Sequence, residues 1–128
     1  MIGFVMIGAN DLEMSTIFYD IVFNELDIVK TFTGKRYNGY SKKNSPENIQ
    51  LYITLPQNKK IATHGNGTMI ALLAKNRDQV NRFHSIALKN GATNEGLPGY
   101  RPSDSKNYYA YIRDMNGNKI CAYCTSDI

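Results

Sequence analysis

The feature that most constrains the fold is an internal repeat, in which a strand pattern followed by an amphipathic helix pattern occurs twice. Apolar residues predict one strand at residues 2–8 and a second at residues 67–75. A capping box, which favours the start of a helix, follows each strand; the two boxes are Asn10 with Glu13 and Asn76 with Gln79. The patterns superimpose at an offset of 66, from Asn10 to Asn76. A repeat of this kind predicts two modules of the same topology.

Apolar residues recur at helical spacing behind each capping box and define one face of each helix. The first stripe consists of Met14, Ile17, Phe18, Ile21 and Val22, and the second of Val80, Phe83, His84, Ala87 and Leu88. Because His84 shares its stripe with apolar residues, we expect a hydrogen-bonded core histidine rather than a catalytic one. Asn90-Gly91 ends the second helix, since glycine readily adopts the left-handed conformation that follows a helix.

Shorter extended stretches complete each half of the repeat. The first half has them at residues 28–33, 37–42 and 49–55, and the second at residues 108–113 and 119–123, where Asn116-Gly117 forms a hairpin turn. Residues 96–102 are rich in glycine and proline and are expected to form a loop. The chain is therefore predicted to be an α+β domain of two tandem βαβββ modules, at about residues 1–58 and 66–128, forming a curved, cup-like mixed sheet with helices outside.

Composition narrows the class of protein. Hydrophobic residues make up 42% of the 128 residues and charged residues 20%, which is typical of a globular protein rather than a disordered or membrane one. The net charge is +4, but lysine and arginine are scattered, so we expect no nucleic-acid partner. The apolar first ten residues have no basic flank and are too short to span a membrane, which makes a cytoplasmic location the expectation.

Three stretches, in order, carry a family resemblance: MIGFVMIGANDLEMSTIFYD, GNGTMIALLAKNRDQVNRFHSIALKNGA and YYAYIRDMNGNKI. They are similar to the opening strand and helix, the second module's strand and helix, and the closing hairpin of the glyoxalase/bleomycin-resistance/extradiol-dioxygenase superfamily, also called the vicinal oxygen chelate superfamily. The resemblance implies paired βαβββ modules around an open barrel, a small-molecule site in the cup and a homodimer.

The resemblance also implies where a divalent metal would bind. Catalytic branches use a histidine in the first strand, a histidine in the strand that opens the second module and a carboxylate in the last strand, with an optional ligand from the first module's last strand. The matching residues here are Phe4, Met69, Cys121 and Gln50. Phenylalanine offers no ligand atom and methionine is a soft one, whereas hard divalent ions prefer oxygen and imidazole. We therefore expect no metal cofactor.

Strand alternation predicts which side chains a ligand in the cup would meet. The cup-facing set is Phe4, Met6, Gln50, Tyr52, Thr54, Met69, Ala71, Cys121 and Tyr123. The helix-facing set is Val5, Ile7, Ile49, Leu51, Ile53, Ile70, Leu72, Ile120 and Ala122. A soft, aromatic and weakly polar lining suits a small, partly aromatic or apolar organic ligand, although the same side chains could instead pack together and fill the cup.

The predicted ligand-binding residues are Phe4, Met6, Gln50, Tyr52, Met69, Arg101, Cys121 and Tyr123, and the candidate catalytic residues are Cys121, Tyr52 and Tyr123. Arg101 is included as an anion anchor in a candidate lid at residues 96–107, which also contains Tyr100, Asp104 and Lys106. Cys121 and Cys124 stand three residues apart on one strand, so their sulfurs should point to opposite faces and share no zinc ion.

The sequence therefore predicts a small-molecule-binding protein in which the usual metal ligands are replaced. A cationic ligand suits a chain of net charge +4 poorly. The alternatives are a metal-dependent lactoylglutathione-lyase-like or dioxygenase-like enzyme with a rearranged ligand set, such as Gln50, Cys121 and Asp104, or a purely structural role with a filled cup. Whether the protein is an enzyme stays open at this point.

Overall fold

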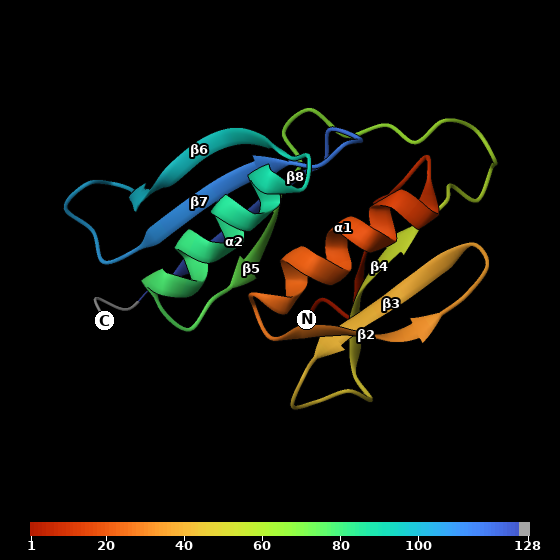
Figure 1. Ribbon diagram of the computed structural model, residues 1–128, viewed down its shortest axis with the longest axis horizontal. Helices are drawn as coiled ribbons and strands as arrows, with labels where there is room; N and C mark the ends of the chain where they lie inside the picture. The colour runs from red at the N-terminus through yellow and green to blue at the C-terminus, as the bar shows by residue number, and fades with distance from the viewer. Residues whose placement is uncertain (126–128) are drawn as a thin grey trace. The chain divides into compact units, whose positions relative to one another are not determined.

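The computed structural model describes residues 1–125, which divide into two compact units, Met1–Thr63 and a second unit that begins at His64 (Figure 1). The first unit contains β1 (Val5–Gly8), α1 (Leu12–Asn24), β2 (Ile28–Thr33), β3 (Tyr37–Lys42) and β4 (Ile49–Thr54). The second contains β5 (Ile70–Leu73), α2 (Arg77–Lys89), β6 (Thr93–Tyr100), β7 (Tyr108–Arg113) and β8 (Lys119–Cys124). The predicted α+β class with two βαβββ modules is confirmed.

Each unit forms one mixed four-stranded sheet. The strand orders are β1-β4-β3-β2 and β5-β8-β7-β6. β1 runs parallel to β4, and β5 runs parallel to β8, whereas the other neighbouring strands are antiparallel. The helix of each unit packs on one face of its own sheet. We call the opposite face of each sheet its open face. In the part of the chain that the structure describes, neither helix is long and apolar enough to cross a membrane.

The start of α1 differs from the prediction by one residue. The N-cap is Asp11, whose carboxylate accepts a hydrogen bond from the Met14 backbone N–H at 3.1 Å. Asn10 instead accepts a hydrogen bond from the Ala62 backbone N–H at 2.7 Å. Asparagine and aspartate cap helices about equally well, so the sequence alone does not choose between them. The two helices therefore correspond at an offset of 65, not 66, as Leu12 and Arg77 show.

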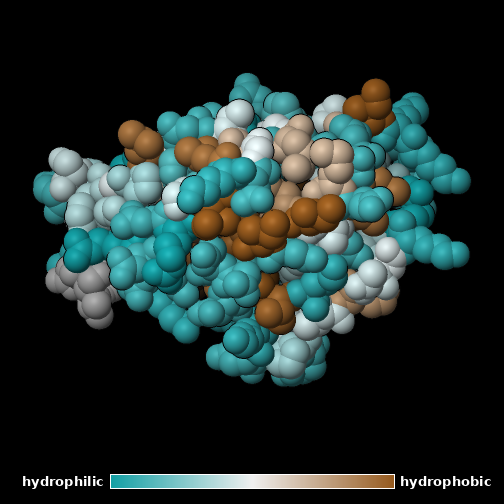
Figure 2. Space-filling view, viewed as in Figure 1, coloured by the Kyte–Doolittle hydropathy of each residue, from teal (hydrophilic) through white to brown (hydrophobic). Residues whose placement is uncertain are grey.

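This shift changes which face of α1 is buried. The buried side chains are Ser15, Phe18, Tyr19, Val22 and Phe23. Three members of the predicted stripe, Met14, Ile17 and Ile21, are exposed by 58%, 58% and 41%. Figure 2 shows a band of hydrophobic side chains on the surface over α1. The helix thus carries two apolar faces, of which only one packs on its own sheet.

The second helix follows the prediction closely. Asn76 caps α2 by accepting a hydrogen bond from the Gln79 backbone N–H at 3.0 Å. The predicted stripe is buried except at its end, where Leu88 is exposed. His84 is buried, and its Nε2 lies 2.9 Å from the Asn94 side-chain oxygen. The expectation of a hydrogen-bonded core histidine is confirmed.

The prediction of a loop at residues 96–102 is wrong, because most of this segment belongs to β6. This edge strand pairs with β7 through two irregularities in register, one between Asn94 and Gly96 and one between Gly96 and Gly99. A side chain at position 96 would collide with the Tyr111 ring, so a glycine lets that ring approach the strand. Glycine and proline therefore mark bulges of an edge strand here. The connection to β7 is confined to residues 101–107.

Candidate functional site

The open face of the first unit carries a row of four aromatic rings. Phe4 meets Tyr52 edge-on at a centroid distance of 5.2 Å, and Tyr52 meets Tyr37 at 5.6 Å. Phe32 stacks on Tyr37 at 5.5 Å. Met6 lies beside this row, since it is the register partner of Tyr52 and its side chain is half exposed. The structure thus brings together the predicted site residues Phe4, Met6 and Tyr52.

A bulge at Gln50 alters the predicted alternation along β4. Tyr40 pairs with Leu51 but the next residue of β3, Ser41, pairs with Ile49, so Gln50 is the additional residue. A Cβ placed on Gly39 would lie 3.0 Å from Ile49 and 3.2 Å from Tyr52. Ile49 therefore shares the open face with Tyr52, and its assignment to the helix-facing set is wrong. Gln50 is exposed at the bulge.

The open face of the second unit carries a stack of three tyrosines, which we call the tyrosine stack: Tyr109, Tyr111 and Tyr123. The Tyr109 ring lies 5.9 Å from Tyr111 at an interplanar angle of 14°, and 5.3 Å from Tyr123 at 20°. All three are partly exposed. Sequence reasoning identified Tyr123 but missed Tyr109 and Tyr111, although their alternate positions in YYAYIR give the necessary signal. Tyr109 is the register partner of Tyr123, so the stack spans β7 and β8.

Two cations lie against Tyr111. The Arg101 guanidinium is 4.9 Å from the ring centroid and the Lys119 ammonium is 5.2 Å from it, both within the range of a cation–π interaction. Arg101 also donates hydrogen bonds to the backbone oxygens of Tyr109 at 3.1 Å and Leu97 at 2.7 Å. The predicted anion anchor thus begins the connection after β6, and its guanidinium lies over the Tyr111 ring on the open face.

Cys121 lies beneath this arrangement rather than on the surface. It is the register partner of Tyr111, and its side chain is 0% exposed. Burial raises the pKa of the thiol to about 11, although a backbone hydrogen bond from Ala110 and the charges of Arg101 and Lys119 oppose the shift. The thiol is therefore protonated at neutral pH, and a ligand on the open face meets Tyr111 first. A thiol in this state is a weak nucleophile.

Cys124 occupies the other side of the sheet. It packs with Val80 and Ala110 in a buried cluster, as expected for a thiol near the helix layer. Neither cysteine forms a disulfide. The prediction that the two sulfurs serve different faces is confirmed, and the C-x-x-C spacing has no role as a shared metal or redox site.

The residues at the family's metal positions do not fit a divalent ion. The Phe4 side chain is a hydrocarbon packed on Tyr52, Met69 offers a partly exposed thioether, and Cys121 is a buried, protonated thiol. Within residues 1–125, His, Cys, Asp and Glu side chains form no group of three that could hold a metal ion. No catalytic step through a metal follows from this donor set.

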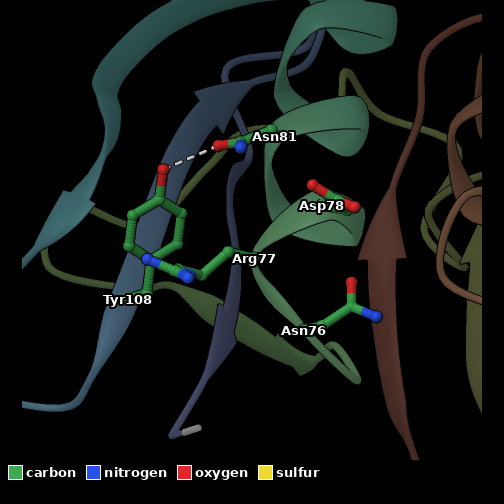
Figure 3. A pocket seen from close by; sticks show the side chains of 5 residues that line it. All are labelled: Asn76, Arg77, Asp78, Asn81 and Tyr108. Carbon is green, nitrogen blue, oxygen red and sulfur yellow. Dashed lines mark hydrogen bonds between the residues drawn. The ribbon is translucent and has the colours of Figure 1, made fainter. Parts of the chain in front are cut away.

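A hollow of about 310 Å³ lies on the helix side of the second unit, lined by Asn76, Arg77, Asp78, Asn81 and Tyr108 (Figure 3). The Tyr108 hydroxyl donates to the Asn81 side-chain oxygen at 2.7 Å, as the dashed line in Figure 3 shows. None of the predicted ligand-binding residues lines this hollow.

Tyr100 lies on this same helix side. Its hydroxyl accepts a hydrogen bond from Arg77 at 2.8 Å, and its ring packs edge-on against Tyr108 at 5.0 Å. The prediction that Tyr100 reaches over the open face is therefore wrong. Asp104 and Lys106, the other two residues of the candidate lid, are exposed in the connection between β6 and β7.

Solved structures with the same fold identify the family. A glyoxalase/bleomycin resistance protein from Albidiferax ferrireducens T118 is 40% identical, covers 95% of this chain and 96% of its own, and superimposes with a TM-score of 0.84. A glyoxalase-related enzyme from Fulvimarina pelagi is 18% identical over 97% of this chain and 87% of its own, with a TM-score of 0.75. The fosfomycin resistance protein FosX from Listeria monocytogenes is 12% identical over 94% and 89%, with a TM-score of 0.68.

Sequence identity separates these three proteins. No family model and no curated protein matches the chain. The likenesses at 18% and 12% identity show the fold alone. The Albidiferax protein, in contrast, matches over nearly the whole of both chains at an identity that establishes common descent. This chain belongs to the glyoxalase/bleomycin resistance protein family.

Proposed function

We propose that this protein binds a small, partly aromatic organic molecule on the open faces of its sheets and does so without a metal ion. The observation that carries the proposal is the replacement of metal ligands by Phe4, Met69 and Cys121 on faces that are otherwise lined by aromatic rings. Aromatic side chains supply large apolar contact area at little cost in conformational entropy, which suits recognition of a planar ligand.

The proposal is for binding rather than for a defined reaction. Of the three candidate catalytic residues, Cys121 is buried and protonated at neutral pH, as its raised pKa requires. Tyr52 and Tyr123 belong to the aromatic row and the tyrosine stack, where their rings contact other rings. Their contribution in this proposal is contact area for the ligand. The cytoplasmic location remains a prediction from the sequence.

The adjacent residues Tyr108 and Tyr109 provide a matched pair of variants for a test. Tyr109 belongs to the tyrosine stack on the open face, whereas Tyr108 packs with Val80 and Cys124 on the helix side. We expect Tyr109→Leu to weaken binding of the neutral fluorescent naphthalene probe prodan by about tenfold, the loss of roughly one aromatic contact. Tyr108→Leu should change the dissociation constant for prodan by no more than about twofold, since this change removes no contact on the open face.

Fluorescence titration measures both dissociation constants, with circular dichroism to check that each variant is folded. Equal effects of the two substitutions, or no saturable binding by the unmodified protein, would contradict the proposal. Repeating the titration with a chelator present should leave the dissociation constant unchanged.

We also propose that the chain forms a homodimer through the exposed stripe of α1. A helix that is apolar on two faces is normally covered on both. At the corresponding positions of α2, which lie 65 residues further on, the chain has Gln79 and Arg82 in place of Met14 and Ile17. The additional apolar face therefore belongs to α1 and is not a requirement of the βαβββ module.

Light scattering coupled to size-exclusion chromatography tests the dimer. We expect the unmodified protein to elute with twice the mass of one chain and Ile17→Glu to elute as a monomer. The control is Arg82→Glu at the corresponding position of α2, which should leave the mass unchanged. A monomeric unmodified protein, or a dimer that withstands Ile17→Glu, would refute this assignment.

A further inference from the structure

The charges around the tyrosine stack are unbalanced. Arg113 forms an ion pair with Glu95, with 3.1 Å between Nε and Oε1, and these two charges neutralise each other. Arg101 and Lys119 form no ion pair with any carboxylate in residues 1–125. Two positive charges on the open face of the second unit therefore have no counter-charge from residues 1–125.

Lys119 is the cation with the greater capacity to bind a ligand. Its ammonium group lies over the Tyr111 ring, and within the described residues it makes no hydrogen bond to a protein oxygen. An ammonium group has three N–H donors, which must then be satisfied by water or by a ligand. The side chain is only partly exposed, so an acidic group that binds here is screened less than it would be in bulk water.

Arg101 has a fixed position and donors to spare. Two of its five N–H groups donate to the Leu97 and Tyr109 backbone oxygens, which hold the guanidinium over Tyr111. Arginine binds carboxylates and related oxyanions through its planar set of donors. Both cations are centred on one ring of the tyrosine stack, so an acidic group and an aromatic ring could be bound side by side.

The first unit provides an internal contrast. Its aromatic row consists of Phe4, Tyr52, Tyr37 and Phe32, and no cation of residues 1–125 lies over any of these rings. On the open faces, as far as the structure describes the chain, the placement of cations over aromatic rings is therefore a feature of the second unit. It does not follow from the βαβββ module itself.

We infer that the open face of the second unit selects a planar aromatic acid, with the ring of the ligand against the tyrosine stack and its acidic group at Lys119 and Arg101. This inference rests on the proposed function and adds the sign of the charge and the place where it binds. A carboxylate, sulfonate or phosphate on an aromatic ring shares the required chemistry, because each presents oxyanions to both cations. A cationic aromatic molecule of the same shape would be repelled.

Three probes with the same ring separate charge from aromatic contact: 2-naphthoate, the neutral 2-naphthalenemethanol and the cationic 2-naphthylmethylammonium. Isothermal titration calorimetry at low salt should show 2-naphthoate binding about tenfold more tightly than the neutral probe, and the cationic probe binding most weakly. Raising the salt concentration should reduce the advantage of 2-naphthoate and leave the neutral probe nearly unaffected.

Lys119→Met identifies the residue responsible. We expect this variant to lose about tenfold in affinity for 2-naphthoate while its affinity for the neutral probe stays within about twofold. Lys119→Arg should restore most of the preference. The control Lys89→Met removes the same charge from the last turn of α2, which packs on the other face of the sheet, and should change neither affinity.

The outcomes distinguish this inference from the proposed function. Equal binding of all three probes would overturn the inference and leave the proposed function standing. A loss of affinity for all three probes on Lys119→Met would also overturn it, because that result indicates a structural role. If none of the three probes binds, both the inference and the proposed function are contradicted.

Discussion

Replacing Phe23 by alanine is expected to lower the free energy of unfolding by about 3–5 kcal/mol, the typical cost of removing a buried phenylalanine. Phe23 is 0% exposed, and its ring contacts Tyr19 at 4.8 Å and Tyr40 at 5.1 Å. Ile21, two residues away on the same helix, is 41% exposed. In the Ile17→Glu background, in which the proposed dimer interface makes no contribution, Ile21→Ala should therefore change the stability by no more than about 0.5–1 kcal/mol, and Phe23→Ala should keep its full effect.

Urea unfolding followed by far-ultraviolet circular dichroism measures both values. The pair is informative because the apolar pattern of the sequence places Ile21 in the core and leaves Phe23 outside it, whereas the structure does the reverse. A larger loss for Ile21→Ala than for Phe23→Ala would mean that α1 packs through the stripe that the sequence suggests. Tyr40 and Phe23 would then not be neighbours.

Alkaline pH is expected to destabilise the protein through Cys121. Burial raises the pKa of its thiol from 9.0 to about 11 in the folded protein. Between these two values the thiol ionises in the unfolded chain but not in the folded one, so unfolding becomes more favourable as the pH rises. Below pH 9 the protonated Cys121 thiol makes its full contribution to the free energy of unfolding, and by pH 11 about 2–3 kcal/mol of that free energy is lost.

Cys121→Ala isolates this effect, because the other groups that titrate in the same range, such as tyrosines, are shared by both proteins. The stability of the unmodified protein should fall more steeply than that of the variant between pH 9 and pH 11. Urea unfolding at pH 8, 9, 10 and 11 gives the two curves. Parallel curves would show that the thiol is accessible to water and does not lie beneath Tyr111.

Most of the fold could be predicted because it depends on local patterns. Residues 28–33, 37–42 and 108–113 are strands with the predicted bounds, since turn residues punctuate them clearly. The packing face of α1 could not be predicted, because Asn10 and Asp11 are both good caps and the helix is apolar on two sides. Which side meets the sheet is decided by long-range packing.

The candidate site shows a similar division. Strand alternation predicted that Tyr52 and Tyr123 face the cup, because alternation is local, and in the structure both rings contact other rings on the open faces. It failed at Ile49, because the bulge at Gln50 of the same strand reverses the side of the sheet that Ile49 faces. It also gave no sign that Cys121 is covered, because Tyr111 belongs to another strand and the pairing register is not visible in the sequence.

The proposal that this family member binds its ligand without a metal ion can be tested by elemental analysis. The protein should be purified without a metal-affinity step and without chelator, and its content of divalent metals measured together with its melting temperature in the presence of each ion. We expect far less than one ion per chain and no ion that raises the melting temperature. One tightly held ion per chain, with a large increase in melting temperature when it is restored after removal, would contradict the claim.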